Sequence, residues 1–132
     1  MGNGNSYYVG VYGSLKSGFS NHDVLQGSPM VDEGWMTGLT LYDLGPFPGV
    51  KKGGDGAVFV EVYRVTDEIL SDLDVLEGYS KANEAGSLYV RRYLNSDMGP
   101  SCWIYLYQGD TSRLPVIEGG NWLGPGITSE FI

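Results

Sequence analysis

The segment from Gly56 to Val65 constrains the fold of this chain more than any other. Apolar side chains occupy both alternating faces of this segment, and most of them are β-branched or aromatic. A strand that is apolar on both faces has to be covered on both sides. The segment therefore predicts a central strand in a closed or covered sheet.

Directly after this strand, the spacing of the apolar residues changes to that of a helix. The apolar residues between Thr66 and Leu76 recur every three or four positions. Thr66 is a suitable N-cap, and Gly78 lies just past the end. The pattern predicts one substantial helix over residues 66–76, and a weaker pattern predicts a short helix over Ser20–Leu25.

Further strands are indicated by short β-branched and aromatic runs between turn residues. The loop Gly45–Gly49 separates two of them, because its two prolines cannot join a ladder. Asp97–Pro100 is a turn between the last two. With no regular strand–helix alternation, the fold class is α+β with a mixed, barrel-like sheet of about six strands. The additional predicted strands are Tyr7–Tyr12, Glu33–Thr37, Leu39–Leu44, Leu88–Asn95 and Ser101–Gln108.

The size and composition of the chain predict one domain over residues 1–132, with an ordered core over about 7–124 and flexible termini. Its 16 acidic and 8 basic residues give a formal net charge of −8 and no basic patch, which argues against binding nucleic acid. The longest apolar run, Cys102–Tyr107, is too short to span a membrane. We therefore expect a soluble, cytoplasmic protein, and the sequence leaves its oligomeric state open.

Several common kinds of site are excluded by residue counts. One histidine, His22, and one cysteine, Cys102, cannot supply a zinc cluster. Cys102 lies in an apolar pattern and is interpreted as a small buried side chain, and His22 as a helix-surface or hydrogen-bonding residue. No phosphate-binding glycine motif is present. We expect neither a metal nor a cofactor.

The loop after the first predicted strand is the first candidate site. Tyr12–Gly18 reads Tyr-Gly-Ser-Leu-Lys-Ser-Gly, so a strand ends in glycine and opens into a polar loop. Successive backbone N–H groups in such a loop can converge on an anion. The alternative interpretation is an ordinary turn.

The second candidate is Glu77, which directly follows the last apolar residue of the predicted helix. A carboxylate is disfavoured at a helix C-terminus, where the exposed carbonyl groups carry partial negative charge. Partial burial would raise its pKa further toward neutrality, as a general acid/base requires. The alternative is a solvated glutamate beside Gly78.

In their order along the chain, these two segments and several others resemble the gamma-glutamylcyclotransferase superfamily, in particular its gamma-glutamylamine cyclotransferase and AIG2-like branch. Each motif alone is weak, and their collinear order is specific. The matching segments are Val11–Gly18 with Asn21, His22 and Leu25, Leu41–Tyr42, Pro46–Val50, Gly56 with Val60–Tyr63, Leu73–Asp74, Glu77–Tyr79, Tyr89–Arg92 and Trp103–Tyr107.

The resemblance implies a small mixed β-barrel with flanking helices and a cavity that needs no cofactor. It implies that backbone N–H groups of the first loop bind a γ-glutamyl group, and that Glu77 transfers protons. Tyr89 matches a tyrosine that lines the family's pocket. Arg91 follows on the same strand and is either part of a stabilising ion pair or a substrate contact. The loop residues implied in substrate binding are Tyr12, Gly13, Ser14 and Leu15.

The activity that the resemblance implies is cyclisation of a γ-glutamyl amine or peptide to 5-oxoproline, with release of the free amine or amino acid. The expected partner is thus a small γ-glutamyl substrate. An alternative is a non-catalytic module that binds a small metabolite or a protein partner on the same barrel. A third is an amide-forming or exchange enzyme. The loops Ser80–Ser87 and Glu118–Pro125 are expected to contact the leaving amine.

Overall fold

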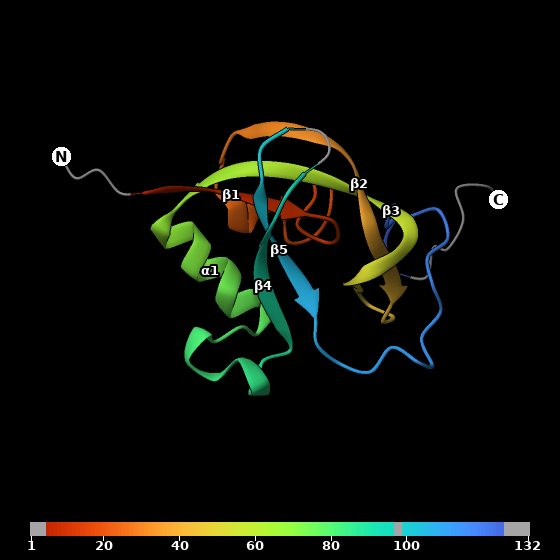
Figure 1. Ribbon diagram of the computed structural model, residues 1–132. Coiled ribbons are helices and arrows are strands. Elements are labelled where there is room, and N and C mark those ends of the chain that lie inside the picture. The colour runs from red at the N-terminus through yellow and green to blue at the C-terminus, as the bar shows by residue number, and fades with distance from the viewer. Residues whose placement is uncertain (1–4, 97–98, 126–132) are drawn as a thin grey trace.

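The computed structural model describes residues 5–96 and 99–125, which form one curled five-stranded sheet with helix α1 against it (Figure 1). The strand order is β2-β3-β1-β5-β4. β1 and β5 run parallel, and all other neighbouring pairs are antiparallel. The predicted α+β class with a mixed sheet is confirmed. The strands are β1 (Ser6–Val11), β2 (Met30–Asp43), β3 (Pro48–Thr66), β4 (Tyr89–Leu94) and β5 (Cys102–Tyr107).

Strand β3 is the longest strand and pairs with β2 along one edge and with β1 along the other. It bends across the molecule and contributes to both apolar clusters of the core. Val60 and Val62 are fully buried in one cluster, whereas Tyr63 and Val65 are buried in the other. The predicted burial of this strand on both faces is therefore confirmed.

Two of the predicted boundaries are wrong. The predicted strands 33–37 and 39–44 are parts of the single strand β2, which ends at Asp43 and continues through an irregularity at Gly38, so the sheet has five strands instead of about six. Gly38 has a φ of 77°, a left-handed conformation that forms a bulge within the strand. In the sequence, a glycine at this position looks like the end of a strand. Pro48 and Gly49 belong to β3 and not to a loop. Pro48 is the first residue of that strand, where its missing N–H is tolerated.

Helix α1 (Asp67–Glu77) matches the predicted helix closely. The Thr66 hydroxyl accepts a hydrogen bond from the Ile69 N–H at 3.3 Å, which satisfies one free donor of the first turn. Gly78 ends the helix with a φ of 67°, the left-handed conformation that glycine adopts readily. Leu70 and Leu73 face the core. This packing places Glu77 at the end of the helix beside the sheet.

Two short 3₁₀ helices complete the described fold. The first, η1 (His22–Leu25), covers the end of the predicted helix over 20–25. The second, η2 (Lys81–Gly86), lies in a segment that the sequence indicated only as a loop. The predicted flexible termini fall largely on residues 1–4 and 126–132, which lie outside the described residues, as do residues 97 and 98 of the predicted turn. No helix in the described ranges has the length and apolar character needed to cross a bilayer.

Candidate active site

A pocket of about 210 Å³ opens where the loop after β1 meets the end of α1 and the start of β3. Glu77, Tyr89 and the loop residues Tyr12–Leu15, which the resemblance implied in catalysis and substrate binding, all line it. The structure therefore brings together segments that are more than 60 positions apart in the chain. The lining residues are Tyr12, Gly13, Ser14, Leu15, Asn21, Phe47, Pro48, Leu76, Glu77, Leu88, Tyr89 and Tyr105.

The loop wall of the pocket begins where β1 ends. A Cβ atom at Gly13 would lie 2.8 Å from Cγ of Pro48, so only glycine fits this close approach. Within the described residues, the backbone N–H groups of Gly13, Ser14 and Leu15 donate to no partner. Asn21 holds the loop in place, because its side-chain amide donates a hydrogen bond to the Ser14 hydroxyl at 2.8 Å. Three consecutive donors are thus left available at the pocket.

Two buried charged residues, Lys16 and Glu61, also support this loop, although they do not line the pocket and the sequence did not indicate them. Lys16 is 3% exposed, and its ammonium donates to the Asn121 side chain and, at 2.9 Å, to the carbonyl oxygen of Trp122. Glu61 accepts hydrogen bonds from the Ser17 N–H at 2.8 Å and from the Tyr63 hydroxyl at 2.7 Å. Glu61 could have been noticed as the one carboxylate in the predicted strand Gly56–Val65, where most side chains are apolar.

Glu77 is the last residue of α1, and its side chain lies in the pocket wall. Glu77 is half-buried, and within residues 5–96 and 99–125 its carboxyl group forms no ion pair or hydrogen bond. Burial without a compensating cation disfavours the ionised form and raises the pKa of Glu77 from 4.5 to about 7. This carboxyl group therefore exchanges a proton near neutral pH.

Three tyrosines form rigid walls around Glu77. The Tyr12 hydroxyl donates to the carbonyl oxygen of Tyr105 at 2.6 Å, and the Tyr89 hydroxyl donates to that of Pro48 at 2.7 Å. Burial raises the pKa of Tyr12, Tyr89 and Tyr105 above the ordinary range, so all three stay protonated. Among the pocket residues, Glu77 is thus the group suited to proton transfer near neutrality.

An ion pair behind the pocket connects α1 to the sheet. Arg91 donates from Nε to Oδ1 of Asp74 at 2.7 Å and from Nη2 to Oδ2 at 3.0 Å. The Tyr105 hydroxyl donates to the same carboxylate at 2.6 Å. Asp74 lies one helical turn before Glu77, so this network fixes the end of the helix against β4 and β5. Arg91 does not line the pocket, which favours the ion-pair interpretation.

The other residues considered in the sequence have structural surroundings. Nδ1 of His22 lies 2.9 Å from the carbonyl oxygen of Leu15, a hydrogen bond that supports the loop. Cys102 is fully buried, and burial raises its thiol pKa to about 11. No described residue of Ser80–Ser87 or Glu118–Pro125 lines the pocket, contrary to the prediction for the leaving amine. Within the described ranges, no three His, Cys, Asp or Glu side chains cluster as a metal site would need.

The described structure is thus a curled mixed sheet with a pocket, and one carboxyl group in the pocket wall has its pKa raised to about 7. The model of the family "Gamma-glutamyl cyclotransferase, AIG2-like" matches residues 9–124, and the chain belongs to this family. Its sequence is 35% identical over 113 residues to the gamma-glutamylcyclotransferase family protein YtfP of Citrobacter rodentium. That alignment covers 86% of this chain and 92% of the relative.

Solved structures agree with this assignment. The solution structure of YtfP from Escherichia coli is 34% identical and superposes with a TM-score of 0.67, covering 88% of this chain and 96% of that one. An uncharacterized protein from Pyrococcus horikoshii is 25% identical, with a TM-score of 0.71 and coverage of 87% and 88%. The fold that the sequence resemblance implied is therefore confirmed.

Proposed function

We propose that this protein cyclises a γ-glutamyl amine or peptide to 5-oxoproline and releases the attached amine or amino acid. One observation carries the proposal. A single pocket is lined by Glu77, whose pKa is about 7, and by a loop with three unpartnered backbone N–H groups. Membership of the gamma-glutamyl cyclotransferase family supports it.

The proposed reaction is an intramolecular aminolysis. The α-amine of the γ-glutamyl group attacks its own γ-carbonyl carbon, a C–N bond forms, and the original amide C–N bond breaks. The attacking nitrogen starts as an ammonium and gives up two protons, and the leaving nitrogen gains two. No water and no cofactor enters this balance. The pocket's first task is to hold the substrate in the folded conformation that brings the amine to the carbonyl.

Glu77 is the proposed carrier of the proton between the two nitrogens. An α-amine holds its proton more tightly than an ordinary glutamate with a pKa of 4.5, so transfer to such a carboxylate is uphill. Raising the Glu77 pKa to about 7 lowers the cost of this transfer by about 3 kcal/mol. The protonated carboxyl group is then ready to deliver the proton to the leaving nitrogen.

The first loop is the proposed binding element for the negative charges of the reaction. The substrate carboxylate and the developing oxyanion on the γ-carbonyl both need hydrogen-bond donors. No lysine or arginine lines the pocket, so the unpartnered N–H groups of Gly13, Ser14 and Leu15 are the proposed donors. Their fixed orientation, supported by Asn21, keeps them in place without reorganisation.

The test is release of 5-oxoproline by the wild type and two matched variants. Glu77→Gln removes the titrating group and keeps the side-chain shape, so we expect turnover to fall by about two to four orders of magnitude. Glu68→Gln makes the same change at an exposed position in the first turn of α1 and should leave turnover unchanged. Turnover of Glu77→Gln at the wild-type rate would remove Glu77 from the mechanism. If the wild type binds γ-glutamyl compounds without forming product, the protein is a metabolite-binding module.

A further inference from the structure

The mouth of the pocket is surrounded by exposed apolar side chains. Phe47, Leu76 and Leu88 line the pocket, yet 37%, 40% and 46% of their surface is exposed. They come from the loop before β3, from the last turn of α1 and from the residue before β4. We call these three residues the apolar rim. Core packing does not explain them, because they contribute to neither buried cluster.

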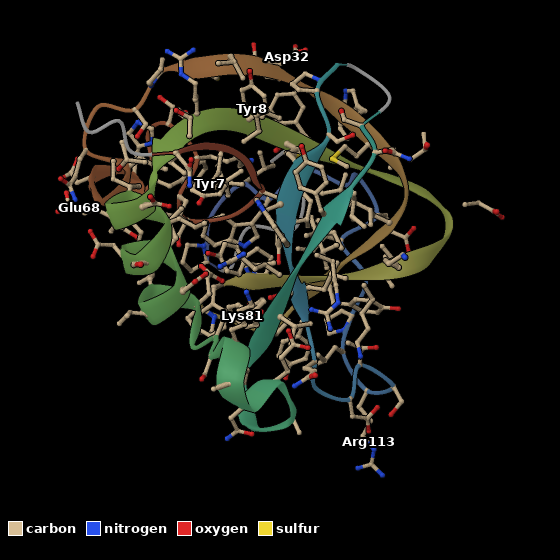
Figure 2. All side chains as sticks on the ribbon, turned by 60° about the vertical axis from the view of Figure 1, so that its left-hand side comes forward. Tyr7, Tyr8, Asp32, Glu68, Lys81 and Arg113 are labelled. Carbon is tan, nitrogen blue, oxygen red and sulfur yellow. The ribbon has the colours of Figure 1, made fainter. Side chains whose placement is uncertain are left out.

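Two of the cations near this region, Lys16 and Arg91, are bonded to other groups, and two, Lys81 and Arg113, lie outside the pocket lining. The Lys16 ammonium is buried against Asn121 and Trp122. The Arg91 guanidinium is bonded to Asp74. Lys81 is exposed in η2, outside the pocket lining, and the Arg113 side chain projects away from the body of the domain (Figure 2).

The apolar rim and the lack of a lining cation together select among leaving groups. An amino acid or peptide leaving group carries a carboxylate, which would lose hydration against the rim without gaining a cation. The ionised form of Glu77 would also repel this carboxylate. A leaving group that carries an ammonium would also lose hydration against the rim. It would have no carboxylate of its own to pair with, since Glu77 is the proposed partner of the substrate α-amine. A hydrocarbon leaving group instead gains from burial on the rim.

From these contacts we propose that the leaving group is an uncharged, apolar alkyl or aryl amine, held by the rim of Phe47, Leu76 and Leu88. This inference rests on the proposed function and narrows its substrate class. The γ-glutamyl half binds in the inner pocket beside Glu77, and the hydrocarbon half extends over the rim. Substrates whose leaving half bears a carboxylate or an ammonium are turned over poorly.

Two matched pairs of substrates test the proposal. γ-Glutamyl-phenethylamide and γ-glutamyl-phenylalanine differ by one carboxylate, and γ-glutamyl-pentylamide and γ-glutamyl-cadaverine differ by one terminal ammonium. We expect kcat/KM for 5-oxoproline release to favour the uncharged member of each pair by about tenfold or more. Equal values, or a preference for the charged member, would overturn the proposal while leaving the cyclotransferase function intact.

A pair of variants locates the preference at the rim. Leu88→Arg places a cation in the pocket mouth, and we expect it to reduce the phenethylamide preference over phenylalanine by about tenfold. Val75→Arg adds the same charge on α1 at a position that is 81% exposed and does not line the pocket, so the ratio should stay at the wild-type value. An unchanged ratio in Leu88→Arg would refute the role of the rim.

Failure of the proposed function is recognisable separately. If none of the four compounds yields 5-oxoproline, the cyclotransferase reaction is rejected, and calorimetric titration of the wild type with the same pairs decides the inference. Tighter binding of both uncharged members supports an apolar rim site. Equal affinities within a pair, or no binding of any compound, overturn it.

Discussion

The half-buried carboxyl group of Glu77, with its raised pKa, predicts that the stability of the protein depends on pH. Its pKa in the folded protein is about 7, whereas in the unfolded chain it is near 4.5. Between these values the folded state holds a proton that the unfolded state has released, so stability falls as the pH rises. Below about pH 4.5 the penalty is absent, and above about pH 7 it is complete.

The size of the penalty follows from the two pKa values. A difference of about 2.5 pH units corresponds to about 3 kcal/mol of unfolding free energy, of which about 2.5 kcal/mol is lost between about pH 5 and pH 8.5. The glutamine side chain of Glu77→Gln cannot ionise, so any other effect of the substitution on the free energy of unfolding is the same at both pH values. We therefore expect the variant to gain about 2.5 kcal/mol relative to wild type on going from about pH 5 to pH 8.5.

Urea unfolding at the two pH values, followed by tryptophan fluorescence, measures this difference directly. A gain of about 2.5 kcal/mol corresponds to a Tm difference between variant and wild type that is roughly 10 °C larger at about pH 8.5 than at about pH 5, for a protein of this size. Glu68→Gln is the control, because its carboxylate is exposed on the same helix and should show no such change. A Glu77→Gln effect that is equal at both pH values would show that Glu77 titrates normally and would remove the basis of its catalytic role.

The remaining predictions concern the supports of the pocket. Asp74→Ala leaves the Arg91 guanidinium without its carboxylate partner, so we expect the free energy of unfolding to fall by about 3 kcal/mol. Urea denaturation measures this change, and a loss below about 0.5 kcal/mol would mean that the ion pair contributes little to stability. Gly13→Ala forces a Cβ against Pro48, so the loop has to shift, and 5-oxoproline release should fall by at least about tenfold with native circular dichroism retained. Wild-type kinetics for Gly13→Ala would show that the loop position is not critical.

The sequence predicted those parts of the fold that depend on local patterns. Helix α1 was predicted within a residue because its cap, its apolar spacing and its terminal glycine all lie within one short segment. The boundaries of β2 and β3 were predicted poorly. Gly38 and Pro48 usually interrupt strands, but a positive φ within β2 and a place at the start of β3 accommodate them. Whether a strand can contain such a glycine or proline depends on its pairing with the neighbouring strand, and this pairing cannot be read from the local sequence.

The candidate site divides in the same way. The loop Tyr12–Leu15 and Glu77 could be selected from the sequence, because glycine at a strand end and a carboxylate at a helix end are local anomalies. Their shared pocket was an expectation from family resemblance, and the coordinates show these residues lining it together. The support of the loop by Lys16 and Glu61 was not predicted, since each contact joins residues far apart in the chain.

By itself the sequence determined the class of fold, the central strand and the main helix, because each follows from the spacing of neighbouring residues. It also singled out the first loop and Glu77 as candidates, whose roles came from the family resemblance. Only the tertiary structure decided the environment of those candidates. The pKa of Glu77, the bonded state of Arg91 and the exposure of Leu88 depend on what lies within a few ångströms in space. Burial and charge pairing arise between segments that meet only when the sheet curls, and these contacts set the chemistry of the pocket.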